Sequence, residues 1–344
     1  MQNALKRVEL CQREIACFRL SDAEFIRRST ADCATIHYLA NSCAFSFSHT
    51  ELMPSHYDRD AAIDALTAIN LDDLYRALGI ERLRGVAPLR RVLRPFARRL
   101  ATQVVTCDNL VGELGLQVGG AWALGQFVRH AVISGQTNVP REGPLMIVAN
   151  HPGLYDTLAL FAAIPRTDLR IISADRPFLR NLPNVSRHLL PIDDASSGRM
   201  GAVRAATRHM RAGGALLLFP GGQIEPDPAT MPGAVAALRE WSESVELFGR
   251  LVPQLTAVSA VVSGVLSATA QRHPLVRLRR TPPERELLAA TLQMLVPSLH
   301  DIPLRVDFGP PLRRSDFARV GEAALAPALL ATTAHLMNAA RGRP

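Results

Sequence analysis

A histidine and an aspartate stand five residues apart in Asn-His-Pro-Gly-Leu-Tyr-Asp, residues 150–156, with apolar runs on both sides. A carboxylate that holds one ring nitrogen of an imidazole fixes its tautomer and leaves the other nitrogen free to accept a proton from a hydroxyl. Five residues is not a same-face helical spacing, so His151 and Asp156 can meet only across a turn. Pro152 and Gly153 favour one. A core histidine beside an aspartate that only caps a helix remains the alternative.

Apolar runs of strand and helix type alternate from about residue 120 onward and indicate what positions this pair. We expect strands at 145–150, 169–175, 215–222, 257–265 and 303–312, and helices at 156–164 and 200–214. This alternation predicts an α/β fold with a largely parallel sheet flanked by helices. His151 directly follows the strand 145–150, and loops at the carboxyl ends of parallel strands are where such sheets place their chemistry.

Changes in composition and in the apolar pattern divide the chain into four regions. We expect a poorly ordered N-terminal extension over 1–52, a basic helical region over 53–119, the α/β domain over 120–315 and a C-terminal helix over 316–344. The stretch 251–271 is long enough to cross a bilayer. Because it contains Pro253, Gly264 and several polar residues, we interpret it as a buried strand followed by a loop.

The chain is basic, with 39 lysine and arginine residues and a formal net charge of +8. All but Lys6 are arginine, whose guanidinium binds phosphate and carboxylate groups in a bidentate manner. Anionic partners are therefore expected. Few aromatic residues interleave with the arginines, which disfavours nucleic acid. The five cysteines are odd in number and form no C-x-x-C, and the histidines other than His151 are scattered. We therefore expect no disulfide framework, no metal and no resident cofactor.

The segment 89–100 has the pattern of a basic amphipathic helix. Its apolar face would hold Leu89, Val92, Leu93, Phe96 and Leu100, and its basic face Arg90, Arg91, Arg94 and Arg98. Such a helix can lie on an anionic membrane, or it can be a solvated helix packed on its own domain. Pro95 predicts a kink or a break.

The motifs resemble those of the glycerolipid acyltransferases, a family that includes the 1-acylglycerol-3-phosphate acyltransferases. The segment NHPGLYD resembles their first motif, N-H-x4-D, and LLLFPGG (216–222) resembles their F-P-E-G motif. VSAVVSGV (258–265) is similar to the fourth motif, and VDFGPPL (306–312) to the segment that closes the domain. The order and spacing agree across roughly 120–312.

This resemblance implies an O-acyltransferase of lipid metabolism and phospholipid biosynthesis. His151 would deprotonate the acceptor hydroxyl, Asp156 would orient His151, and the acyl donor would be acyl-CoA or acyl carrier protein. The default acceptor is lysophosphatidate, and the enzyme would be cytoplasmic and peripheral on the inner face of the cell membrane. Candidate substrate-binding residues are Asn150, Arg176, Arg180, Arg199, Phe219, Pro220, Gly221, Gly222 and Glu225.

Two departures from the family pattern leave the acceptor open. Gly221 stands where the F-P-E-G glutamate is expected, and Glu225 is a candidate for a related role. Asp193 and Asp194 stand where the second motif normally carries a phosphate-binding arginine, for which Arg176, Arg180, Arg187 and Arg199 are possible substitutes. Two alternative functions are a catalytically decayed lipid-binding protein and an ester or thioester hydrolase that uses the same base.

Overall fold

A computed structural model describes residues 33–37, 58–153, 155–192, 196–299, 303–313, 316 and 325–341. Within them a nine-stranded sheet has the order β1-β2-β8-β7-β3-β6-β4-β5, and β9 pairs with β7. The strands are β1 (Cys33–His37), β2 (His130–Ser134), β3 (Leu145–Ala149), β4 (Arg170–Ala174), β5 (Leu189–Ile192), β6 (Ala215–Leu218), β7 (Thr256–Ser263), β8 (Leu304–Phe308) and β9 (Leu312–Arg313).

The sheet is mostly parallel, as the alternating pattern predicted. β3 pairs in parallel with both β6 and β7, and β4 with β5 and β6, whereas β7 pairs antiparallel with β8 and β9. Val148 of β3 is opposite Leu218 of β6 and Ser259 of β7. The carboxyl ends of these three central strands therefore meet at one edge of the sheet.

Helices cover both faces of this sheet because its central strands are apolar on both sides. Leu145, Ile147 and Ala149 of β3 pack into a cluster with helices α3 to α5, and Met146 and Val148 into a second cluster with α8, α10 and α13. These helices are α3 (Ala87–Leu114), α4 (Leu116–Gly125), α5 (Asp156–Ala163), α8 (Ser196–Arg211), α10 (Ser244–Leu251) and α13 (Leu325–Arg341).

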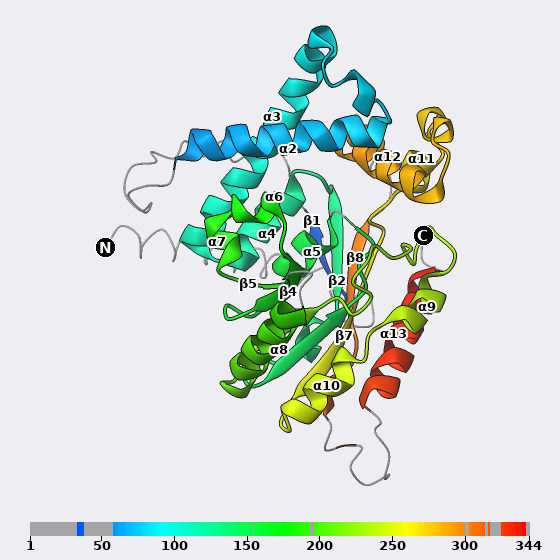
Figure 1. The fold of residues 1–344 in the computed structure, drawn as a ribbon. Helices are drawn as coiled ribbons and strands as arrows, with labels where there is room; N and C mark the ends of the chain where they lie inside the picture. Colours follow the sequence, from blue (N-terminus) through cyan, green and yellow to red (C-terminus); the bar gives the residue numbers. More distant parts are fainter. Residues whose placement is uncertain are drawn as a thin grey trace. The chain divides into compact units, whose positions relative to one another are not determined.

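The remaining helices are short, apart from two that lie together (Figure 1). The long ones are α2 (Arg59–Leu78) and α12 (Pro282–Leu295). The short ones are η3 (Glu81–Leu83), η4 (Gln136–Asn138), α6 (Pro177–Arg180), α7 (Pro183–Ser186), α9 (Ala234–Ala237), η5 (Leu238–Glu240), α11 (Ala268–Gln271), η6 (Pro274–Leu278) and η7 (Pro297–Leu299).

Helix α3 differs from its prediction in two ways. It runs unbroken through Pro95, which is exposed, so the side of the helix that loses a hydrogen bond faces away from the core. The apolar face is also divided. Leu93 and Ala97 are buried among residues of α2, while Val92 and Phe96 are exposed on the other side. The exposed part of α3 is therefore apolar as well as basic.

The structure also bears on the predictions for segment 251–271, for the strands and for the region boundaries. Strand β7 confirms that 251–271 contains a buried strand, and none of the helices in the described ranges has the length and hydropathy needed to cross a bilayer. The predicted extension 1–52 lies outside the described residues except for 33–37, which form the edge strand β1. Strands β2 and β5 were not predicted. Residues 34–344 form one compact unit, so the boundary at 119/120 separates two regions of one unit.

Candidate active site

The predicted base and its orienting carboxylate meet at the carboxyl end of β3. His151 Nδ1 lies 2.7 Å from Asp156 Oδ2, because residues 151–155 turn before α5 begins. Gly153 has a φ of 128° in this turn, a value that L side chains rarely adopt. The Gly153 N–H donates to Asp156 Oδ2 at 3.0 Å. The second ring nitrogen of His151 is left for another partner, and 30% of the side chain is exposed.

Asp156 is more than a helix cap. Its side chain is 1% exposed, and Oδ1 accepts from the Thr157 hydroxyl at 3.0 Å and from the Thr157 backbone N–H. With Oδ2 engaged by Gly153 and His151, both carboxylate oxygens are saturated. The carboxylate is therefore fixed in place, and it fixes the imidazole in turn.

The surroundings make His151 a stronger base than a free histidine. Burial lowers its pKa, but the Asp156 hydrogen bond and the charges of Asp156 and Glu225 outweigh this effect, so the pKa is raised above 6.5. The charge of Arg176 opposes the rise. On its remaining side the ring packs on Phe219, with the ring centroids 4.8 Å apart. A proton taken from a substrate hydroxyl would be stabilised here by two carboxylates.

The loop after β6 brings a second carboxyl group to the histidine. The Glu225 backbone N–H donates to the His151 carbonyl at 2.8 Å, and Glu225 Oε1 accepts from Trp241 Nε1 at 2.9 Å. The other oxygen, Oε2, is buried without a hydrogen-bond partner among the described residues. Burial raises the pKa of Glu225 to about 7, although the Trp241 hydrogen bond and the charge of His151 oppose the shift.

The position of Glu225 explains why residue 221 is glycine. A Cβ atom added at Gly221 would overlap Glu225 Oε1. The space that a side chain at residue 221 would take is therefore filled by a carboxylate from four residues further along the chain. The glutamate that is absent from the F-P-E-G position is matched by a carboxyl group in the same place.

Two buried side chains hold the loops of this edge together. Asn150 is fully buried, and its amide exchanges hydrogen bonds of 2.9 and 2.8 Å with the Val262 backbone of β7. Asp227 accepts from the backbone N–H groups of Ala229, Gly264, Val265 and Leu266. Asn150 was predicted to bind substrate. Both ends of its amide are occupied and no part of it is exposed. We therefore infer that Asn150 anchors the residue before His151 to β7 and does not contact substrate.

The candidate arginines are not equivalent. Arg176 is exposed at the start of α6, and its charge acts on His151. Arg180 is bound bidentately by Asp175 at 2.9 and 2.6 Å, which leaves fewer of its N–H groups for a substrate phosphate. Arg199 is exposed on α8. Asp193 and Asp194 lie outside the described residues. Arg176 is thus the cation that the structure relates to the base.

Some backbone groups of the turn after β6 form hydrogen bonds within the protein. The Gly222 N–H donates to the Phe219 carbonyl at 3.1 Å, and the Pro220 carbonyl accepts from Ser242 at 3.1 Å. Trp241 and Asp227 were not recognised as functional or supporting residues in the sequence. Trp241 stands sixteen residues after Glu225 with no repeated spacing, so no sequence signal could have paired them. Asp227, in contrast, was visible as an acid in a proline-rich loop.

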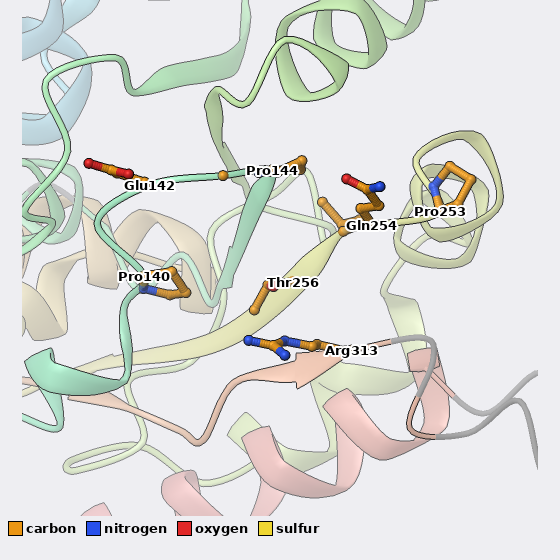
Figure 2. Close-up of a pocket in the computed structure, with 9 residues that line it drawn as sticks. Pro140, Glu142, Pro144, Pro253, Gln254, Thr256 and Arg313 are labelled. Atoms are coloured by element: carbon orange, nitrogen blue, oxygen red, sulfur yellow. The ribbon is translucent and has the colours of Figure 1, made fainter.

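A hollow of about 400 Å³ lies at the opposite edge of the sheet (Figure 2). It is lined by residues that precede β3 and β7, with Thr256 and Arg313 paired across β7 and β9. Since β3 and β7 run in parallel away from the hollow towards His151, the hollow is separated from the base by the length of the strands. It is not part of the candidate active site.

Two comparisons with known proteins found proteins similar to this chain. Residues 130–247 match the model of the family described as Acyltransferase. One solved structure similar to the chain is the 1-acyl-sn-glycerophosphate (LPA) acyltransferase PlsC from Thermotoga maritima. It has 16% sequence identity and a TM-score of 0.40, with 80% of this chain and 99% of that chain covered. No protein of curated function matches the chain.

The matched segment begins at β2 and ends in α10, so it contains His151, Asp156, Phe219 and Glu225. The match over residues 130–247 supports the resemblance to the glycerolipid acyltransferase superfamily that the N-H-x4-D segment indicated.

Proposed function

We propose that the protein is an O-acyltransferase that moves a fatty acyl group from a thioester donor to the hydroxyl of a lysolipid. The observation that carries the proposal is the contact of 2.7 Å between His151 Nδ1 and a fully bonded Asp156, inside the matched acyltransferase domain. The second ring nitrogen takes the proton of the acceptor hydroxyl. The acceptor oxygen forms the new C–O bond, the C–S bond breaks, and the proton passes to the leaving thiolate.

Lysophosphatidate is the default acceptor, and acyl-CoA or acyl carrier protein the donor. Arg176 suits the acceptor phosphate because it is exposed and close enough to influence the pKa of His151, and guanidinium groups bind phosphate in a bidentate manner. Phe219 and Gly221 line the same loop. We assign Glu225 Oε2 a hydrogen bond with substrate, since a buried oxygen without a partner is costly until one arrives.

A peripheral position on an anionic membrane follows from the lipid substrate and from the exposed face of α3. Val92 is 62% exposed and Phe96 is 45% exposed, and they are flanked along the chain by the exposed arginines Arg91 and Arg99. Apolar side chains that enter the headgroup region, together with arginines that meet acidic lipids, are what surface-bound helices use. We propose that this face of α3 rests on the inner face of the cell membrane.

The test is acyl transfer from long-chain acyl-CoA and from acylated carrier protein to a panel of lysolipids, with wild type beside His151→Ala. We expect transfer to lysophosphatidate, reduced by about 100- to 10,000-fold in the variant, because a general base contributes that much. The unfolding midpoint should not fall, since a side chain 30% exposed gives little packing.

Other outcomes select the alternatives. Transfer to a different lysolipid keeps the mechanism and replaces the acceptor. Release of free fatty acid without any alcohol acceptor would identify a hydrolase. Tight lipid binding with no turnover from either donor would identify a lipid-binding protein with a decayed site, and unchanged turnover in His151→Ala would refute the proposed base.

A further inference from the structure

Exposed apolar side chains are concentrated in two segments far apart in the sequence. Thirteen large apolar side chains are exposed in the described part of the chain, and eight of them lie between residues 83 and 96 or between 275 and 296. Helices α3 and α12, to which these two segments belong, lie in the upper part of Figure 1, away from α8, α10 and α13. The eight are Leu83, Val86, Val92, Phe96, Leu275, Leu278, Leu287 and Val296.

A direct contact joins the two segments. Helix α2 ends at Gly79 with a left-handed φ of 70°, and the Arg279 guanidinium occupies the place of a side chain at that glycine. Arg279 also pairs with Glu284 at 3.3 Å, which fixes it at the start of α12. Leu83 lies four residues after Gly79, and Leu278 directly precedes Arg279. The end of η3 and the end of η6 are therefore held close to the same contact.

The second segment is basic as well as apolar. Leu278 is 76% exposed, the highest value among the exposed apolar side chains, whereas its neighbour Val276 is buried and fixes η6 on the body. Exposed arginines surround Leu278 at Arg272, Arg277, Arg280 and Arg285. In this segment Glu284 is engaged by Arg279 and by two backbone N–H groups. The surface therefore presents apolar side chains in a positive field.

We infer that residues 272–287, comprising η6 and the first turns of α12, form a second contact with an anionic bilayer, beside the exposed face of α3. The inference rests on the proposed function in that a lipid substrate brings the enzyme to the membrane. A bilayer fits better than a protein partner because arginines meet acidic headgroups while apolar side chains enter the interface. Contacts through both the exposed face of α3 and residues 272–287 would fix the orientation of the enzyme on the bilayer. A single helix would leave the enzyme free to rotate about that helix.

The experiment is flotation with vesicles of phosphatidylcholine and phosphatidylglycerol, beside vesicles of phosphatidylcholine alone. We expect the double variant Arg277→Gln/Arg280→Gln to bind mixed vesicles on the order of 10-fold more weakly, at about fivefold or less for each arginine. Leu275→Ser/Leu278→Ser should lose a similar factor, because the two leucines would no longer bury apolar area in the interface. Binding to pure phosphatidylcholine should be weak throughout.

Matched controls separate this surface from general effects. Leu247→Ser, an exposed apolar residue on α10, and Arg129→Gln, an exposed arginine near β2, should bind vesicles like wild type. Turnover of a soluble short-chain acceptor should be unchanged in both double variants, and vesicle binding can be measured even if no acyl transfer is found. Wild-type vesicle binding by both double variants would overturn the inference, as would loss of binding to acyl carrier protein with vesicle binding intact.

Discussion

Each edge of the central sheet carries a charged pair of which one member is buried, Arg166 at the amino edge and Asp156 at the carboxyl edge. The two edges differ in the hydrogen-bonding capacity that they leave unused. At the amino edge, Arg166 donates two hydrogen bonds to the Asp168 carboxylate, at 2.8 and 2.7 Å. Its remaining N–H groups donate to the carbonyls of Pro140, Gly143 and Gly213. At the carboxyl edge, His151 keeps one nitrogen for another partner and Glu225 Oε2 has none among the described residues.

We infer that this difference separates a structural pair, Arg166 and Asp168, from the proposed catalytic pair, His151 and Asp156. Arg166 ties together the loop before β3, the loop before β4 and the end of α8, and it has no capacity left for a ligand. A fully satisfied buried network rigidifies the fold. The carboxyl edge holds buried polar groups with unused bonding capacity, which is costly in the free protein and useful only when substrate completes it.

The sharpest way to break the functional pair is Asp156→Asn. The amide cannot stabilise the imidazolium and favours the wrong tautomer, so kcat should fall by about 1,000-fold, or about 4 kcal/mol. The folded state should persist, because the asparagine oxygen retains one of the backbone hydrogen bonds. The measurement is single-turnover acyl transfer, normalised to folded protein.

Thr157→Val is the matched control for that change. It removes the hydroxyl that donates to Asp156 Oδ1 and leaves the contact with His151 in place. A rate loss of less than about 10-fold is expected, because the backbone N–H of residue 157 still donates to the same carboxylate oxygen. A loss as large as that of Asp156→Asn would mean that the carboxylate acts through its position alone and not through its charge.

The structural pair should break in the opposite way. Arg166→Met removes a guanidinium that is 3% exposed and leaves three loop carbonyls without a donor, so the free energy of unfolding should fall by about 1–3 kcal/mol. Loss of the ion pair itself adds little, because the Asp168 side chain is 41% exposed. Turnover per folded molecule should stay within about twofold, because the pair lies a full strand length from His151. Urea denaturation and activity assays on the same samples measure both quantities.

The contrary result for Arg166→Met would be equally clear. A large loss of turnover with unchanged unfolding would place a functional site at the amino edge, near the hollow lined by Thr256 and Arg313. Asp168→Asn is the companion variant. Because the Arg166 hydrogen bond holds the pKa of Asp168 below its usual value, the carboxylate contributes stability above the unfolded pKa, and that stability is lost as pH falls through the lower folded pKa.

Sequence reasoning found the functional pair more readily than the structural one. His151 and Asp156 sit in one short motif after an apolar strand, so local spacing and a turn were enough to bring them together. The helices and strands of the central α/β region followed from apolar periodicity for the same reason, since each signal lies within a few residues. The division of the α3 apolar face was missed because it depends on which side α2 covers.

The contacts that could not be predicted join distant segments. Arg166 contacts carbonyls more than twenty residues away on either side, and Trp241 reaches Glu225 from sixteen residues further along the chain, beyond α9 and η5. The sequence pointed to Gly221 and to Glu225 as a candidate for a related role, but not to the place that the Glu225 carboxyl group takes beside that glycine. Which group fills it depends on how residues 222–241 fold back, which no local pattern encodes.

Glu225→Gln tests the role of the unsatisfied carboxyl oxygen at the carboxyl edge of the sheet, for which we expect the smallest effect. The folded pKa of Glu225, about 7, lies above the unfolded value of about 4.3, so the folded state favours the protonated form. Wild-type stability should therefore fall as pH rises between these two values and stay low above them. Glutamine keeps the Trp241 hydrogen bond without a charge, so the variant should be more stable than wild type at alkaline pH, by about 2 kcal/mol.

The same substitution should lower activity, which distinguishes function from packing. The charge of Glu225 helps to raise the pKa of His151, so its removal should move the acidic limb of the kcat/KM profile to lower pH, with a rate loss of about 10-fold. Glu240→Gln, an exposed acid on η5, should change neither stability nor the profile. If the Glu225→Gln profile superimposes on wild type while stability rises, Glu225 only fills the space beside Gly221. A rate loss with a shifted limb would instead make the unsatisfied oxygen at the carboxyl edge part of the catalytic machinery, which is what the contrast with the saturated Arg166 predicts.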